Sequence, residues 1–474
     1  MGERSRFRAS LIRVGLGVTL LSAGYASAES LEHQILTPVG QPAAVLQLKT
    51  PSNHVVTPEI REEHLDIVNQ LPGLRINRRL SFDEFMRDVE QANLLLAAQR
   101  FNGTIARARL VAAGVYPDPT FQGGYSADVS GEDQGDTYSF QLSQEVVVPG
   151  KIGNRVAAAQ AGVTSSDAGL ADYWRNLRAT AANSFIDGIA QILIIQRKIE
   201  ALQRAAQLVD LNTKTLKAKH SSEDNLLRAK VGELEARSDL LTSELTLRQT
   251  LAGLNLLMGQ RESEGLVLPQ GNLDEPERKF VLDDLVNHAV TSRSDVLAAR
   301  AGVEAAKAQY RLARANLVTD PTVSGMFTHN SEITNRIDPA PRWNSLGIQV
   351  SLPIPLSDLN SGAREAAYYA ELQSEHRLKA VELQAENDVR TAYDSYRLTK
   401  VTEDQFGNEL LDDATSMYKE RLFKLEKGLV VLTDVLDAHA TLNQLYLDYY
   451  NALDANAKAL VALEQAAGIW DISF

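Results

Sequence analysis

The sequence predicts a mainly α-helical fold that also contributes strands to a membrane β-barrel, built from one structural unit used twice. The stretch Tyr116–Phe121 returns as Thr319–Val323, and Pro119 recurs at Pro321, 202 positions later (321 minus 119). In both copies an Ala/Arg-rich helical pattern leads in, two short alternating segments follow, and a very long proline-free stretch comes last. Because self-similarity at a fixed spacing indicates a repeated unit, we expect a duplicated helix, β-hairpin and long helical hairpin.

The first 28 residues are expected to be a secretory signal peptide. Arginines occupy positions 4, 6, 8 and 13, an apolar run covers 14–21, and Ala-Ser-Ala stands at 26–28. This is the layout of a cleaved export signal, and the apolar run is much shorter than the roughly 20 residues of a membrane-spanning helix. Residues 29–79 carry five scattered prolines and weak periodicity, so we predict an extended N-terminal arm there.

Composition narrows the class of partner and of covalent chemistry. The 474 residues carry a formal net charge of −13, which disfavours nucleic acid and anionic lipid as partners. The chain has no cysteine, which excludes disulfides, thiolate metal sites and a lipid anchor on an N-terminal cysteine. An exported protein without disulfides needs a large helical core or assembly.

The repeats are expected at 80–268 and 280–474, joined by a linker at 269–279. The first opens with Ser81, which is followed three residues later by Glu84 as in a capping box. Apolar residues then recur at helical spacing as far as Val111, and Gly114 ends the helix.

A β-hairpin is predicted at about 119–149 and a second at about 321–353. Apolar and small polar residues alternate along these segments, and 130–136 is a polar turn. Alternation over about ten residues, with aromatic residues on the apolar side, is the weak signature of a transmembrane strand. A hairpin packed on a soluble core would give the same pattern. The apolar positions include Phe121, Tyr125, Tyr138, Phe140 and Leu142 in the first copy and Leu346, Ile348, Val350 and Leu352 in the second.

Long helical hairpins are predicted at about 155–259 and 362–468. A continuous helix from Val156 to Lys219 would measure ~95 Å, which a single domain core cannot bury. Each long stretch breaks once, at 218–224 and at Lys427-Gly428, where Ser222 or Thr433 could cap the returning helix. Narrow apolar stripes on these helices favour packing side by side in a hollow wall; a solvated coiled-coil stalk without a pore is the alternative.

Assembly follows from the number of strands. Backbone inside a membrane must be fully paired, which requires a closed barrel. One chain offers four strands, and small barrels begin at eight. Two copies would give eight strands and three would give twelve, and the small polar inward face favours the wider barrel. We therefore expect a homotrimer.

These features resemble the TolC family of outer-membrane efflux proteins, the outer-membrane factors of tripartite export systems, from about Ser81 to Gly468. The most specific motif is the second tip, Gly428–Ala438, where Asp-Val-Leu-Asp-Ala follows a glycine-led turn. The resemblance implies a homotrimer with a 12-stranded barrel and a 12-helix periplasmic tunnel in the cell outer membrane. It also implies docking onto a periplasmic adaptor protein and an inner-membrane pump, with the resistance-nodulation-division type as the expected pump.

Candidate site residues follow from the same resemblance. The channel entrance would be lined by two aspartates and their apolar neighbours, and rings of acidic side chains attract cations. Family members that gate by a tyrosine and an arginine carry these upstream; the corresponding positions here are Leu425 and Val430, which favours an apolar or differently latched constriction. The proline motifs mark the helix-to-strand junctions, because a residue before proline is pushed toward extended backbone. The expected sets are Asp434, Asp437, Val430 and Leu429 for the entrance, His220, Ser221, Ser222, Lys427 and Gly428 at the tips for adaptor docking, and Asp118, Pro119, Asp320 and Pro321 at the junctions.

Catalysis is not expected, and neither is a cofactor or a bound metal. The eight histidines show no metal-binding spacing, and neither a nucleophile elbow nor a phosphate-binding loop is present. The predicted function is a passive outer-membrane conduit for efflux, with metal cations or small toxic compounds as substrates. A duct for type I protein secretion and a pore-free secreted coiled-coil scaffold remain as alternatives.

Overall fold

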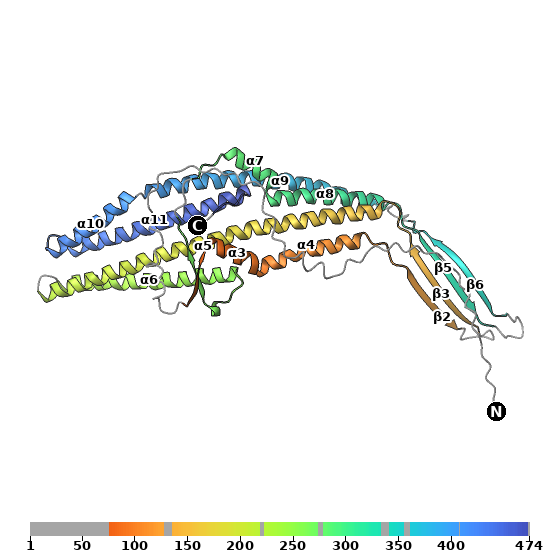
Figure 1. Cartoon of the computed structure of the whole chain (residues 1–474), viewed down its shortest axis with the longest axis horizontal. Helices are drawn as coiled ribbons and strands as arrows, with labels where there is room; N and C mark the ends of the chain where they lie inside the picture. Colours follow the sequence, from red (N-terminus) through yellow and green to blue (C-terminus); the bar gives the residue numbers. More distant parts are fainter. Residues whose placement is uncertain are drawn as a thin grey trace, which may run out of the picture. The chain divides into compact units, whose positions relative to one another are not determined.

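The computed structural model describes residues 75–127, 135–218, 222–273, 278–332, 341–354, 361–406 and 408–472. The expected signal peptide and almost all of the expected arm lie outside this range. The helices are α3 (Phe82–Ala92), α4 (Leu94–Ala113), α5 (Lys151–Lys217), α6 (Glu223–Leu257), α7 (Leu282–Ser292), α8 (Ser294–Ala315), α9 (Ser361–Gln405), α10 (Asn408–Glu426) and α11 (Leu432–Ala467). The strands are β1 (Ile76–Ser81), β2 (Thr120–Ala127), β3 (Asp136–Glu145), β4 (Leu266–Gln270), β5 (Thr322–Asn330) and β6 (Trp343–Ser351) (Figure 1). Among the described residues, no helix has the length and apolarity needed to cross a membrane.

The predicted capping box at the start of the first repeat is present. The Ser81 hydroxyl accepts a hydrogen bond from the Glu84 N–H, and the Glu84 carboxylate accepts one from the Ser81 N–H. The single helix expected as far as Val111 is instead two helices, because Asn93 adopts an extended backbone. Its side chain accepts from the Leu96 N–H at 2.8 Å and so caps α4.

The four long strands form one antiparallel sheet in the order β2-β3-β5-β6. The two hairpins join where β3 meets β5, with Glu145 opposite Thr322 and Thr137 opposite Asn330. Aromatic side chains meet across neighbouring strands, for example Tyr125 and Tyr138 at 5.1 Å between ring centroids. Strands β2 and β6 are the edges of this sheet, and every residue of β2 is exposed.

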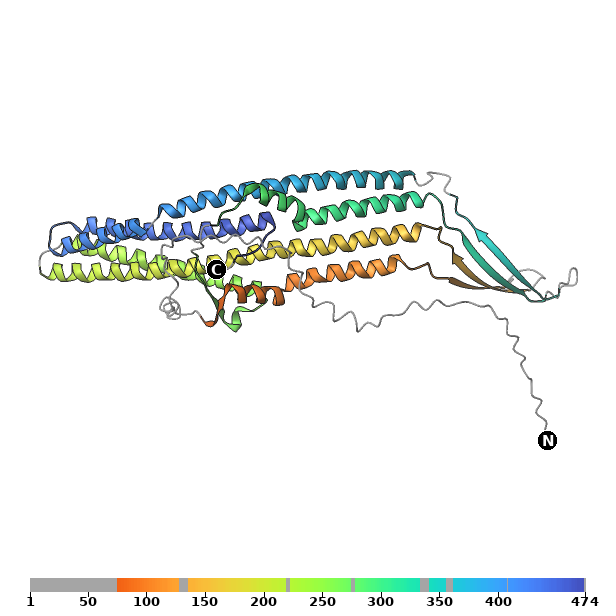
Figure 2. The same cartoon turned by 45° about the horizontal axis from the view of Figure 1, so that its top comes forward.

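Two helical hairpins carry the tips predicted near 218–224 and 427. Helix α5 packs along α6 and also along α4, α8 and α11, with Phe185, Ile186 and Ile189 almost fully buried. In the second repeat, α11 returns along both α10 and α9. The end of α5, the start of α6 and the turn between α10 and α11 lie at the end of the helices that is remote from the four-stranded sheet (Figure 2). The outgoing helix is continuous in the first repeat, whereas in the second it is divided into α9 and α10.

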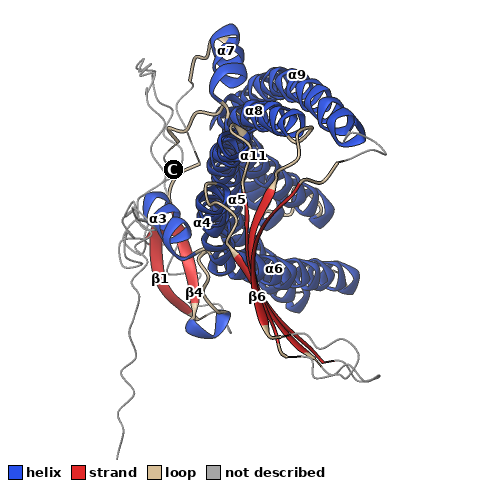
Figure 3. Cartoon of the chain, turned by 90° about the vertical axis from the view of Figure 1, so that its right-hand side faces the viewer, coloured by secondary structure: helices blue, strands red, loops and turns tan. Residues whose placement is uncertain are grey.

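A small parallel sheet joins segments that the sequence assigned to an arm and a linker. Strand β1 pairs with β4, with Leu80 opposite Pro269 (Figure 3). The end of the predicted arm and the start of the predicted linker are therefore strands. Leu266, Val267 and Leu268 are 0–3% exposed. Five residues are too few to show clear alternation, and burial on both sides conceals the period.

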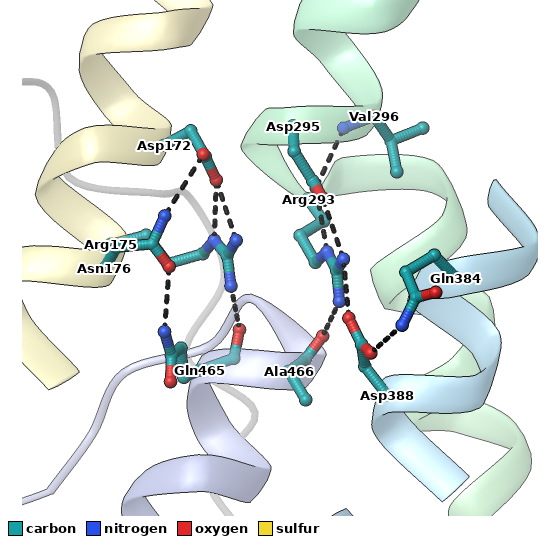
Figure 4. Close-up of polar contacts among 10 residues, drawn as sticks. All are labelled: Asp172, Arg175, Asn176, Arg293, Asp295, Val296, Gln384, Asp388, Gln465 and Ala466. Atoms are coloured by element: carbon teal, nitrogen blue, oxygen red, sulfur yellow. Dashed lines mark hydrogen bonds and ion pairs between the residues drawn. The ribbon is translucent and has the colours of Figure 1, made fainter. Parts of the chain in front are cut away.

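The carboxyl end of α11 is held by arginines from two other helical segments (Figure 4). Arg175 of α5 pairs with Asp172 and donates to the Gln465 carbonyl at 2.8 Å. Arg293, only 3% exposed, pairs with Asp295 and Asp388 and donates to the Ala466 carbonyl at 3.1 Å. Cations at unpaired terminal carbonyls stabilise a helix, so this network joins α11 to both repeats.

Candidate functional site

The tip of the second hairpin is a tight glycine turn. Gly428 has a φ of +71°, a left-handed conformation that glycine adopts without a steric penalty. Its N–H donates to the Leu425 carbonyl at 2.9 Å, and the Leu429 N–H donates to the Lys424 carbonyl at 2.9 Å. These bonds satisfy the last carbonyls of α10, as in a Schellman motif, and Lys427 and Gly428 are both exposed.

Apolar packing fixes the start of α11 against the neighbouring helices. Leu432 and Val435 are 2% and 0% exposed and join a cluster that includes Leu208 of α5 and Tyr418 of α10. Val430 is half-buried and packs against this cluster, whereas Leu429 is 71% exposed. Of the two apolar residues expected at the entrance, Leu429 is thus the one that the single chain leaves open.

The two aspartates expected at the entrance lie on the first turns of α11, in different electrostatic settings. Asp434 is half-buried and pairs with Arg421 of α10, 3.7 Å away. Asp437 is exposed, and no ion pair to it is recorded within the described part of the chain. Arg421 was not singled out from the sequence. It lies on the other helix of the hairpin, and only the turn geometry brings it to Asp434.

Asp437 also borders a groove between the two hairpins. This groove has a volume of about 790 Å³ and is lined by Arg197, Lys198 and Ala201 of α5, by α6 and by α11. Ion pairs lie along it, Arg228 with Asp224 and Lys198 with Asp239. The tip therefore combines an exposed carboxylate, an exposed leucine and a charged groove.

A buried histidine lies two residues beyond Asp437 on the same helix. His439 is 8% exposed, its ring centroid lies 5.5 Å from that of Tyr418, and its Nε2 is 3.2 Å from the Asn443 side-chain nitrogen. Burial, with a contribution from Arg204, lowers the pKa of His439 to about 4. His439 is therefore neutral near pH 7.

The two tips begin their returning helices differently. Ser222 caps α6 by accepting a hydrogen bond from the Asn225 N–H at 3.3 Å, as one of the two expected caps. The other expectation, a cap by Thr433, is wrong: α11 begins after Val431, which makes no side-chain cap bond. Thr433 already lies inside the helix. His220 and Ser221 lie outside the described residues.

The two helix-to-strand junctions, which looked equivalent, have different partners. Asp320 accepts from the Val148 N–H at 2.7 Å and from the Lys151 ammonium at 2.8 Å, so it binds the end of the first hairpin to the start of β5. Asp118 is exposed. Asp320 therefore does more than mark the change from helix to strand, which is the only role that the sequence indicates for it. Lys151 is distant from Asp320 in the sequence, so the sequence gives no signal of their ion pair. Pro119 and Pro321 directly precede β2 and β5.

Comparisons with known proteins agree with this architecture. The model of the outer membrane efflux protein family matches residues 285–469. The cobalt-zinc-cadmium resistance protein CzcC of Cupriavidus metallidurans is 23% identical over 337 residues, which cover 70% of this chain and 77% of CzcC.

Solved structures show the same fold. The Campylobacter jejuni CmeC outer membrane channel aligns with a TM-score of 0.68 at 13% identity, over 89% of this chain and 94% of CmeC. CusC aligns with a TM-score of 0.65 at 18% identity, over 82% of this chain and 92% of CusC. These likenesses confirm the predicted fold class. Residues 285–469 thus resemble the outer membrane efflux protein family, and this match, together with the similarity to CzcC and CusC, confirms the predicted resemblance and the general function, an outer-membrane channel for efflux.

Proposed function

We propose that three copies of this chain form a passive conduit that carries substrates from a periplasmic adaptor and an inner-membrane pump to the exterior. The single observation that carries this proposal is the four-stranded sheet with two open edges, β2 and β6. An open edge inside a membrane leaves backbone groups without partners at a cost of several kcal/mol for each group. Three copies supply twelve strands and no edge.

The location proposed for the conduit follows from the expected signal peptide and from the separation of the sheet and the helical tips. The expected signal peptide at 1–28 would export the protein, which has no cysteine for a lipid anchor. The sheet would lie in the outer membrane, and the helical hairpins would extend into the periplasm. The tips at Ser222 and at Lys427-Gly428 are then the parts nearest to the inner membrane and are the proposed contacts for the adaptor.

Divalent metal cations are the proposed substrates, exported with a pump of the resistance-nodulation-division type. The similarity to a cobalt-zinc-cadmium resistance protein supports this substrate class. So does Asp437, because three copies would place three exposed carboxylates around one axis. Asp434 and Leu429 would lie beside it in the proposed constriction.

Two measurements test the proposal. The purified protein in planar bilayers should give stepwise conductance and should require detergent for solubility; a detergent-free soluble protein without conductance steps would instead indicate a pore-free scaffold. In a host that lacks its own outer-membrane channel for metal export, the chain expressed with its cognate pump and adaptor should restore growth on zinc, cobalt or cadmium. Restored secretion of a protein substrate without metal resistance would favour the type I duct.

A further inference from the structure

The internal repeat of the sheet fixes how its two open edges meet in the trimer. The first hairpin (β2 and β3) is already joined to the second (β5 and β6) inside one chain, through the β3–β5 pairing. The contact between β6 of one copy and β2 of the next joins the same two kinds of hairpin. The β3–β5 pairing is therefore a template for the β6–β2 seam, an inference that rests on the homotrimer proposed above.

The template measures how far the register advances across one hairpin. Thr120 lies opposite Ser143, and Ser143 lies opposite Ser324. The repeat equivalent of Thr120 is Thr322, because each directly follows the proline of its junction motif. A line drawn at right angles to the strands from Thr120 therefore passes through Ser143 and reaches Ser324. This residue is two positions beyond Thr322, the repeat equivalent of Thr120 (324 minus 322). The strands advance by two residues for each hairpin.

A regular barrel keeps one strand tilt all the way round, so a seam that repeats the template gives the second hairpin the same advance. The line continues from Ser324 to Gln349 of β6. Two further positions of advance place Gln349 opposite Gly124 in the next copy, and Ser351 opposite Gln122.

The tilt of the barrel limits the registers that the seam can adopt. The shear of a barrel is the number of residues by which the register advances over one full circuit. Two residues for each of six hairpins give a shear of 12. With twelve strands, a rise of about 3.3 Å per residue and a spacing of about 4.8 Å between strands, this shear corresponds to a tilt of about 35°. The register two residues shorter gives a shear of 6 and a tilt of about 19°, and the one two residues longer gives a shear of 18 and about 46°. Membrane barrels tilt by roughly 35–45°, which excludes the shorter register, whereas both the proposed register and the longer one fit this range. The advance seen within the chain selects the proposed register.

The side chains along both edges fit as well. In this register Leu352, Val350 and Ile348 lie opposite Phe121, Gly123 and Tyr125. Val350 and Ile348 are 65% and 83% exposed in the single chain, and Phe121 and Tyr125 are 69% and 61% exposed. Pairs of aromatic with aliphatic side chains across neighbouring strands stabilise a sheet. The geometry points to a β6–β2 seam between copies of this chain in which Ser351 lies opposite Gln122.

Engineered cysteines test the register directly, since the chain contains none. Gln122→Cys is combined in turn with Gln349→Cys, Ser351→Cys or Pro353→Cys, which report shears of 6, 12 and 18. In the β3–β5 template, Val146 and Pro321 are a hydrogen-bonded pair. Hydrogen-bonded and non-hydrogen-bonded pairs alternate along an antiparallel ladder, so Ser143 and Ser324 are a non-hydrogen-bonded pair. Residues 351 and 122 are their equivalents at the seam and would be non-hydrogen-bonded as well. Their Cα atoms would lie about 4.5 Å apart, within disulfide range, whereas diagonal neighbours lie roughly 7–8 Å apart.

The readout is a non-reducing gel of the full-length detergent-solubilised protein after mild oxidation, with each single-cysteine variant as a control. We expect covalent trimers for the 122/351 pair and largely uncrosslinked chains for the other two pairs. Dominant crosslinking of either other pair overturns the register. Light scattering on the same samples reports the assembly. A trimer in which no pair crosslinks overturns the seam alone, whereas a protein that is not trimeric overturns the proposed assembly as well.

Discussion

The charges of the second tip predict how strongly multivalent cations block the channel. Removing the charge of Asp437 should weaken the block, whereas removing the Arg421–Asp434 pair together should not. Asp434 shares an ion pair with Arg421, whereas Asp437 is exposed. Removing the pair together leaves the net charge of the tip unchanged. Removing Asp437 takes away one negative charge in each chain, and therefore three in the proposed trimer.

The magnitudes favour Asp437 as the residue that controls block. At 3.7 Å the attraction between Arg421 and Asp434 is about 1 kcal/mol in water, and both side chains are about 40% exposed, so the pair contributes between about 0 and 1 kcal/mol. A trivalent cation held roughly 8 Å from one carboxylate gains about 1.6 kcal/mol before screening and about 0.6 kcal/mol at 0.15 M salt. Three carboxylates give about 2 kcal/mol, which is a change in affinity of roughly tenfold to thirtyfold.

The assay is block of single channels in planar bilayers by hexaamminecobalt(III), whose inert ligands prevent direct coordination to the protein. Asp437→Asn should weaken block by about tenfold or more, and Asp434→Asn with Asp437→Asn should weaken it further. The control Arg421→Gln with Asp434→Asn conserves charge and should leave block nearly unchanged. The reasoning is refuted if this control weakens block as much as Asp437→Asn does, or if Asp437→Asn has no effect. The effect must also shrink as salt is raised.

Three further predictions concern the junction, the buried histidine and the apolar residue of the tip. Asp320→Asn should lower the free energy of unfolding by about 3 kcal/mol, because it leaves the buried Lys151 ammonium unpaired; thermal unfolding in detergent measures this, and Lys151→Met with Asp320→Asn, which removes both charges, is the control that should recover most of the loss. The pKa of His439 is lowered from 6.5 to about 4 in the folded state, so below pH 6.5 the unfolded chain binds a proton that the folded chain does not. The free energy of unfolding should therefore be unaffected by His439 above pH 6.5 and should fall as the pH drops toward 4, by about 2 kcal/mol at pH 5. Hydrogen exchange, corrected for intrinsic rates, should show lost protection at 432–442 between pH 7 and pH 5, and equal loss in His439→Phe would contradict it. Val430→Ser should raise basal conductance if this residue helps to close the entrance, and unaltered conductance would count against that role.

Most of the fold could be predicted because its elements are long and locally specified. The proline motifs, the strand alternation and the long proline-free helices each carry their signal within a few dozen residues, and the Ser81 and Ser222 caps are visible as short motifs. The β1–β4 pair was missed for the opposite reason. It joins two short segments almost 190 positions apart, such as Leu80 and Pro269, and neither has a pattern of its own.

The tip shows the same division between local and distant information. The glycine turn and the two aspartates could be found in the sequence, because a turn residue and an acidic pair three positions apart are local features. The Arg421–Asp434 pair could not, since it depends on the angle at which α10 and α11 leave the turn. The cap was assigned to Thr433 because a hydroxyl is the usual signal. Here buried Leu432 and Val435 fix the start of α11, so packing replaces the cap.

The pair of junction motifs shows how duplication within a chain prepares assembly between chains. Asp320 meets its partners, Val148 and Lys151, because the first hairpin ends beside the start of β5 in the same chain. Asp118 stands at the start of β2, an open edge, where the preceding hairpin would come from another copy in the proposed trimer. The two aspartates thus differ in exposure although their local sequences match. One of the two junctions is completed within the single chain, and the other would be completed only in the proposed trimer.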